Sequence, residues 1–314
     1  MLFYLIRRFL SALVTIFLAS ALVFVAILAV PGDPAEIILG INASPQALAA
    51  LREQLGLNEP AWRRYLSWLG GVVRGDFGES LNYQRPVATL IVDRLEVSVP
   101  LALGAMFVAC VIALPVGIVA ALSRGRWLDP LLTSLAQLGA AVPSFWLGLM
   151  LILLFSVELG WLPAAGYVPW ERDPVATLRS LALPVLALGL GQAAVMTRMT
   201  RAAMIEVLSQ DYVRTASAKG LPRRRVVGGH ALRNALVTLV TIFGLSLSQL
   251  LIGSIIIEQV FSLPGLGRLV LTAIGTRDFP LLQGEILVYA SAIVLLSFLV
   301  DVSYGLLDPR IRYQ

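Results

Sequence analysis

Long stretches without charged side chains constrain this chain more than any other feature of its sequence. Six such runs of about twenty residues follow one another, and only the last contains a charge, Asp301. A bilayer core about 30 Å thick needs about 20 helical residues to cross it. We therefore predict an all-α membrane protein with about six transmembrane helices. The runs are Phe9–Val30, Val97–Leu122, Leu131–Val157, Ser180–Thr197, Ala235–Ile257 and Ile286–Leu307.

Composition agrees with a membrane protein. Charged residues make up 14% of the chain and apolar residues 58%, whereas a soluble domain carries about 25% charged residues. The first apolar run follows Arg7 and Arg8, as the apolar core of a signal peptide does, but it is longer, and no small-residue cleavage signal precedes Pro31. We interpret residues 1–30 as an N-terminal segment with a retained first span.

Basic residues are distributed unevenly between the two sides that six spans define. Fourteen lie in one set of short loops and chain ends, against four in the opposite short loops. Short cytoplasmic loops are enriched in Arg and Lys, so we expect the fourteen, and both termini, in the cytoplasm. The fourteen are Arg7, Arg8, Arg124, Arg126, Arg198, Arg201, Arg214, Lys219, Arg223, Arg224, Arg225, Arg233, Arg310 and Arg312; the four are Arg172, Arg179, Arg268 and Arg277.

Several kinds of chemistry are excluded by residue counts. Cys110 and His230 are the single Cys and the single His, so no Cys/His zinc site can form. The single Lys, Lys219, stands between Ala218 and Gly220, so the chain has no Walker A sequence for nucleotide phosphates. We therefore expect no catalytic, cofactor-binding or metal-binding residues in this chain, and no enzymatic activity of its own.

The segment 31–96 is predicted to be a small external domain between the first and second spans. Ser44 before Pro45 is typical of a helix start, and this helix should run through Leu55 and stop at Gly56. A second helix should run from Pro60 through Val73. Aromatic and apolar residues at helical spacing in it should pack the domain or lie in the headgroup region, as an alternative to stacking on a ligand. They are Trp62, Tyr65, Trp68 and Leu69.

The most informative loop is 198–234, between the fourth and fifth spans. Asp211 to Lys219 should form a short helix, since an acidic residue suits its start and a basic residue its end. Gly220 followed by Pro222 is a stop signal. The loop could rest on anionic headgroups, or it could be a knob that docks in a cytoplasmic protein. The first five spans lack the mid-depth ionisable residues that ion-coupled carriers usually place along their path, which favours the knob.

This loop resembles the coupling loop of ATP-binding-cassette (ABC) importer permeases. In that motif a Glu-Ala-Ala is followed a few residues later by a Gly. Gly220 takes the Gly position, and Arg214, Thr215 and Ala216 take the Glu-Ala-Ala positions. The form found here, together with His230–Leu236, is similar to that of peptide and nickel permeases. The resemblance implies that the loop couples to an ATPase through Asp211, Tyr212, Arg214, Thr215, Ala216, Ala218, Lys219 and Gly220.

Four further stretches extend the resemblance over the whole chain. Together they identify the sequence as similar to the B-type membrane subunit of dipeptide/oligopeptide importers. They are Tyr4-Leu5-Ile6-Arg7-Arg8, Pro31-Gly32-Asp33-Pro34, Gly75-Asp76-Phe77-Gly78-Glu79-Ser80 and Leu307-Asp308-Pro309-Arg310-Ile311-Arg312-Tyr313. The family's fold would then be a type I importer permease core at 97–307, followed by a cytoplasmic tail at 308–314.

The resemblance also implies partners and a location. Such permeases work in the bacterial inner membrane with a second, homologous permease, with two ATPase subunits that hold ATP and magnesium, and with an external substrate-binding protein. The lipid bilayer surrounds them, and no nucleic acid is involved. The cargo would be a di- or oligopeptide, with a nickel chelate or a glutathione-like peptide as alternatives. Other classes of function are an ion-coupled secondary transporter or a membrane anchor without a transport path.

Single residues inside the spans lead to further expectations. Asp301 should be a structural or gating charge, paired with Arg198 or Arg201 at similar depth. Pro115, Pro143 and Pro184 lie within apolar runs and can kink helices. The turn-rich stretch 261–267 should be a simple external connector or a re-entrant element near an outer gate.

Overall fold

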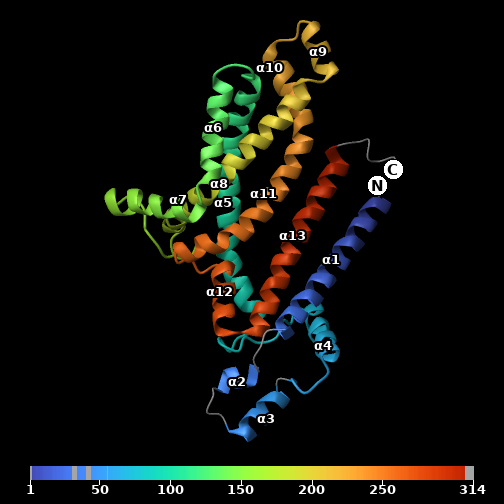
Figure 1. Ribbon diagram of the computed structural model, residues 1–314, viewed down its shortest axis with the longest axis vertical. Coiled ribbons are helices and arrows are strands. Elements are labelled where there is room, and N and C mark those ends of the chain that lie inside the picture. Colours follow the sequence, from blue (N-terminus) through green and yellow to red (C-terminus); the bar gives the residue numbers. More distant parts are fainter. Residues whose placement is uncertain (1, 30–33, 40–43, 55, 308–314) are drawn as a thin grey trace.

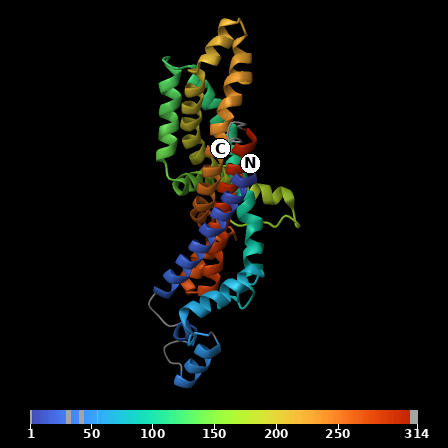
Figure 2. The ribbon, with the colours of Figure 1, turned by 90° about the vertical axis from the view of Figure 1, so that its right-hand side faces the viewer.

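The computed structural model describes residues 2–29, 34–39, 44–54 and 56–307. Five helices of the described part are long and apolar enough to cross a membrane, and a bent pair makes six if it is counted as one span. The molecule is elongated, with α2 to α4 at one end and α9 and α10 at the other (Figures 1 and 2). The long helices are α1 (Leu2–Ala29), α5 (Val87–Leu122), α8 (Pro174–Leu208), α11 (Arg233–Val260) and α13 (Phe279–Leu307). The predicted class, an all-α membrane protein of about six spans, is confirmed.

The third predicted span is broken near Pro143, one of the three prolines expected to be able to kink a helix. α6 (Leu128–Ala141) ends before Pro143, and α7 (Ser144–Leu151) with η1 (Ile152–Glu158) continues at 91° to it. Val142 is extended, because a residue before proline is driven out of the helical region. α7 consequently projects sideways from the bundle (Figure 1). By contrast, α5 and α8 continue through Pro115 and Pro184.

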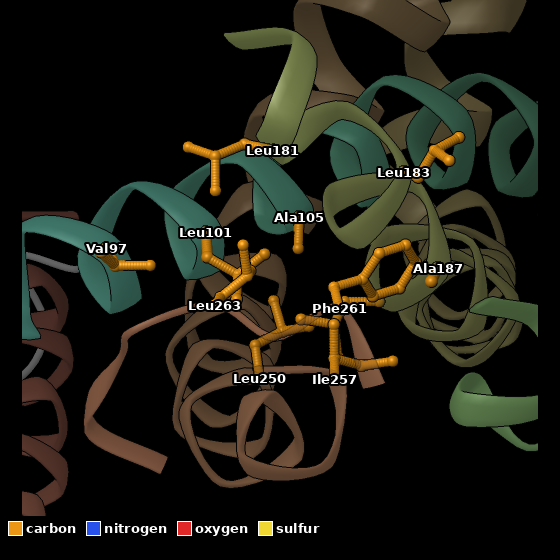
Figure 3. Packing of buried hydrophobic residues seen from close by; sticks show 11 residues of the cluster. Val97, Leu101, Ala105, Leu181, Leu183, Ala187, Leu250, Ile257, Phe261 and Leu263 are labelled. Atoms are coloured by element: carbon orange, nitrogen blue, oxygen red, sulfur yellow. The ribbon is translucent and has the colours of Figure 1, made fainter. Parts of the chain in front are cut away.

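The core of the bundle is formed by α5, α8 and α11. α5 and α8 approach closely because small residues face each other: a Cβ on Gly117 would collide with Thr197 and Thr200, and one on Gly189 with Ala105. Nearer the α12 end, larger side chains from all three helices and the turn after α11 interdigitate (Figure 3). These are Val97, Leu101, Ala105, Leu181, Leu183, Ala187, Leu188, Leu250, Ile257, Phe261 and Leu263. Their contact fixes the position of α11 against the other two helices.

α1 lies outside this core and packs along α13 (Figure 1). Phe9 and Phe298 meet edge to face with ring centroids 6.3 Å apart, and Arg8 Nη2 lies 2.9 Å from Asp301 Oδ1. The predicted pairing of Asp301 with Arg198 or Arg201 is therefore wrong. The reason is tertiary: the end of α13 lies beside α1, and Arg201 already pairs with another carboxylate.

That carboxylate is Asp129, at the start of α6. Arg201 of α8 holds it with two parallel bonds, Nε to Oδ1 at 2.6 Å and Nη2 to Oδ2 at 2.7 Å. The aspartate side chain is 10% exposed and the arginine 28%. This bidentate pair fixes the start of α6 against α8 in a shielded position, where such pairs are strongest.

The segment between α1 and α5 contains both helices predicted from the sequence. α3 (Pro45–Gln54) is capped by Ser44, whose Oγ accepts from Ala47 N at 3.2 Å, and α4 (Ala61–Val73) follows Pro60. A further short helix, α2 (Pro34–Leu39), precedes them. Leu55, the predicted end of the first helix, lies outside the described residues, as do Val30, Pro31, Gly32, Asp33 and the tail 308–314.

Aromatic side chains dock α4 onto α1. Tyr65 packs against Phe17, Phe24 and Trp68, and its hydroxyl lies 2.7 Å from Ser20 Oγ. The periodic aromatics of this segment thus pack it to the first span, as predicted, although Trp62 remains 64% exposed.

Candidate functional site

The predicted loop helix exists and ends where the sequence indicates. α9 (Asp211–Ala218) follows the end of α8, with Gln210 before its first turn and Lys219 after its last. Gly220 has φ +78°, a left-handed conformation that glycine adopts without steric cost. Pro222 then opens α10 (Arg223–Arg225). α9 consequently stands at the far end of the molecule from α2 to α4 (Figure 1).

α9 has one face toward its own chain and one toward solvent. Val213 and Ala216 are buried and pack with Val226, together with Leu208 and Leu221. The other side chains of the helix, and Lys219 after it, are exposed. These are Asp211, Tyr212, Arg214, Thr215, Ser217, Ala218 and Lys219. Seven of the eight residues singled out by resemblance thus lie on the free surface of the loop, including Gly220, and Ser217 joins them.

Ala216 is the exception. At 7% exposure it seats α9 against the rest of the loop. The free face is polar, and Arg214 Nη1 lies 3.7 Å from Asp211 Oδ1. Partial burial of the Tyr212 ring raises the pKa of its phenol.

The loop is connected to both central helices of the bundle. α8 leads directly into α9. After α10, the π-helix η2 (Val226–Leu232) leads into α11. Ala231 and Ala235, at this junction, are fully buried in one cluster with Met196 and Met204 of α8. α9 is therefore connected to both α8 and α11.

A second group of polar side chains lies where α11 meets α12 (Leu266–Thr276). Glu258 is fully buried; its Oε1 accepts from Ser98 Oγ at 2.7 Å and its Oε2 from Arg268 N at 3.1 Å. Ser98 Oγ in turn accepts from Leu266 N at 2.8 Å. Glu258 and Ser98 thereby each accept from one free amide at the start of α12.

This group explains the glycines of the stretch 261–267. A Cβ on Gly265 would run into the Glu258 carboxylate, and one on Gly267 would run into Ile255 and come close to the same carboxylate. The stretch forms a tight turn that connects α11 to α12. That helix covers the end of the bundle, where Leu266, Leu269 and Ala273 pack with residues of α5 and α13.

Glu285 of α13 lies in the same region and was not singled out from the sequence. It is fully buried, and neither carboxylate oxygen has a hydrogen-bond partner among the described residues. The charged groups that act on it are Glu258, Asp278 and Arg94. Both glutamates stand directly beside a predicted charge-free run. Their position at the edge of an apolar span was the feature of the sequence that could have indicated burial. Since α11 extends to Val260, Glu258 lies inside a span, and the expected lack of charge there holds only away from the ends.

Asp278 binds the end of the stretch 75–80, one of the four stretches that carry the resemblance. Its Oδ2 accepts from Ser80 Oγ at 2.5 Å and from Asn82 N at 3.0 Å. Ser80 ends the stretch 75–80, whose Gly75 and Gly78 both have positive φ. The motif thus ties the chain before α5 to the start of α13. Within the part of the chain that the structure describes, no three His, Cys, Asp or Glu side chains are grouped to hold a metal ion.

Comparison with known proteins places this architecture. Residues 113–313 match the family model of the binding-protein-dependent transport system inner membrane component, and residues 1–102 match that of its N-terminal part. The chain is 43% identical over its full length to the glutathione transport system permease protein GsiC of Escherichia coli (strain K12), covering 100% of both chains. It is also 43% identical, over 98% of each chain, to a Brucella abortus (strain 2308) protein named "Putative peptide transport system permease protein".

The fold has a solved counterpart. A chain of the MetNI methionine ABC transporter in an inward-facing conformation superposes with a TM-score of 0.59 at 20% identity, covering 70% of this chain and 96% of that one. The shared part is the helical core of a type I importer. Full-length relatives, the family match and this core agree. The chain therefore belongs to the binding-protein-dependent transport system inner membrane components and is a multi-pass permease component of an ABC importer.

Proposed function

We propose that this chain is one of two membrane subunits of an importer for small peptides, with α9 as its contact to an ATPase. The observation that carries the proposal is the placement of α9: it presents a polar, exposed face while it is continuous with α8 and joined to α11 through η2. A partner that pushes on this face moves the two helices of the core together. Nucleotide and magnesium would be held by the partner ATPases.

The orientation follows from the same placement. α1 begins and α13 ends toward the end that carries α9 (Figure 1), and the loops there hold most of the basic residues. By the positive-inside rule this end faces the cytoplasm. The segment 31–96 then lies outside, where a substrate-binding protein would dock, and residues 97–307 form the transport core.

The cargo is proposed from the relatives. Both the glutathione permease and the Brucella protein named for peptide transport match the chain from end to end. Both names point to a peptide as cargo, and we propose a di- or oligopeptide for this chain, with a glutathione-like peptide as the alternative. Within the described residues there is no metal-binding group, so a nickel ion would pass only as a chelate.

Uptake by a deletion strain tests the proposal. Loss of this chain should abolish uptake of labelled dipeptide or glutathione, and the wild-type chain should restore it. Arg214→Glu, on the free face of α9, should fail to restore uptake, whereas Arg225→Glu, in the same loop on α10, should restore it. Normal peptide uptake in the deletion strain, with lost uptake of a nickel chelate, would contradict the assignment of cargo.

A further inference from the structure

A groove that the transport mechanism does not use opens beside the coupling loop. It lies between the last turn of α5 and the α10–η2 segment and has a volume of about 610 Å³. Three arginines line it: Arg126 from the turn after α5, and Arg223 and Arg224 from α10. Its remaining walls are mainly apolar, formed by Val119, Leu122 and Val227.

The charge of the groove is uncompensated within its own walls. No carboxylate is among its lining residues, and the buried carboxylate of Asp129, at the start of α6, is bound on both oxygens by Arg201. Arg223 Nη2 donates to the Leu122 carbonyl at 3.2 Å, which holds its guanidinium at the rim. Arg126 and Arg224 are exposed. Three guanidinium groups line this one opening, and guanidinium groups are the side chains best suited to donate several N–H bonds to a phosphate.

The groove also lies at the level of a membrane surface. The apolar part of α5 ends at Leu122, and Trp127 in the following turn is 71% exposed, a position typical of the headgroup region. Val119, one turn inside, is 45% exposed although it is apolar. The groove therefore has an apolar wall toward the hydrocarbon and a cationic rim toward water. An anionic phospholipid complements both, with its acyl chains in the hydrocarbon and its negative phosphate at the surface.

We infer that this groove binds one anionic phospholipid, with its phosphate held by Arg126, Arg223 and Arg224 and its upper acyl carbons against Val119, Leu122 and Val227. The inference rests on the proposed function in one respect, because the proposed orientation places this end in the cytoplasmic leaflet. A lipid bound there contacts both the α5–α6 turn and η2.

Native mass spectrometry of the detergent-purified, full-length protein, with whatever subunits copurify, tests the inference. The protein is exchanged into phosphatidylglycerol or into phosphatidylcholine with the same acyl chains, and the retained lipid is counted. Arg126→Gln with Arg224→Gln removes two charges from the groove. Arg124→Gln with Arg225→Gln is the matched control, because it removes two charges from the same segments outside the groove.

Wild type and the control pair should retain phosphatidylglycerol in preference to phosphatidylcholine. The groove pair should lose roughly twenty-five-fold in affinity, since each arginine near an anionic lipid contributes roughly fivefold. Equal loss in both pairs would overturn a specific site and indicate a diffuse surface charge. Displacement by millimolar inorganic phosphate would overturn a lipid site in favour of an anion site. Loss of copurifying ATPase with unchanged lipid retention would assign the arginines to a protein contact instead.

This readout is independent of transport. Lipid retention is measured without substrate, and it requires neither uptake nor the predicted orientation. A failed uptake experiment with preserved phosphatidylglycerol binding would therefore reject the proposed cargo and leave the lipid site standing, and the reverse result would reject the lipid site alone.

Discussion

At the scale of single residues, two alanines of α9 face opposite ways. Ala216 is packed between Val213 and Val226, whereas Ala218 is exposed. Ala216→Trp must displace its neighbours, and overpacking costs about 1–3 kcal/mol. We expect it to loosen the loop, raise its sensitivity to limited proteolysis, and abolish uptake. Ala218→Trp adds the same side chain without that cost, so the loop should resist protease as in wild type.

The Ala218 variant is also the test of the free face. If that face docks in an ATPase, Ala218→Trp should reduce the amount of ATPase that copurifies and reduce uptake, at normal membrane expression. Full copurification and full uptake would show that the ATPase contacts the chain elsewhere.

Two ion pairs of this chain should differ in strength. Asp129 is largely buried and held by two bonds from Arg201, whereas Asp301 meets an Arg8 side chain that is 47% exposed. Removing one partner of a buried pair costs about 3–5 kcal/mol, and we expect the lower side of that range for Asp129→Asn because Arg201 keeps some contact with water. Asp301→Asn should cost less than about 1 kcal/mol. Thermal unfolding of both purified variants compares them, and equal shifts in Tm would contradict this ranking.

At the scale of elements, η2 is the segment most suited to flexing. A π-helix breaks the regular hydrogen-bond ladder and frequently occurs at functional sites, and η2 contains Gly228 and Gly229 in succession. A Cβ on Gly229 would meet nothing closer than Arg225 Cγ at 4.0 Å, so alanine fits there. Gly229→Ala should stabilise the protein by about 0.5–1 kcal/mol, because glycine is the weaker helix former.

If η2 flexes during coupling, the same substitution should slow uptake while it raises Tm. Gly191→Ala on α8, where a Cβ also meets nothing within 4 Å, is the control and should leave uptake unchanged. A Gly229→Ala protein that is more stable and transports at the wild-type rate would show that η2 acts as a rigid connector.

At the scale of the whole molecule, the orientation of the bundle can be measured directly. Cys110 is the single cysteine, so Cys110→Ala gives a background without thiols. A cysteine at Arg225 should be labelled by a membrane-impermeant maleimide only after the inner membrane is opened, and one at Val73, which is 82% exposed, in intact spheroplasts. Labelling of the Arg225 site in intact spheroplasts would reverse the proposed topology.

The sequence by itself determined those features that depend on neighbours along the chain. Charge-free runs fixed where spans lie, because hydrocarbon accepts no unpaired charge. Local backbone chemistry fixed the starts of α3 and α4 at Pro45 and Ala61, and the stop of α9 before Gly220. The coupling role of α9 came from resemblance and stays a prediction.

Tertiary structure alone decided what depends on residues far apart in the chain. The bond from Arg201 to Asp129 spans 72 positions, and that from Ser98 to Glu258 spans 160. Which face of α9 is buried, which arginine meets Asp301, and why Gly265 must lack a side chain follow from such contacts. Hydropathy and helix propensity are sums over adjacent residues, whereas burial and ion pairing depend on which helices pack together, and that choice is made by the fit of whole surfaces.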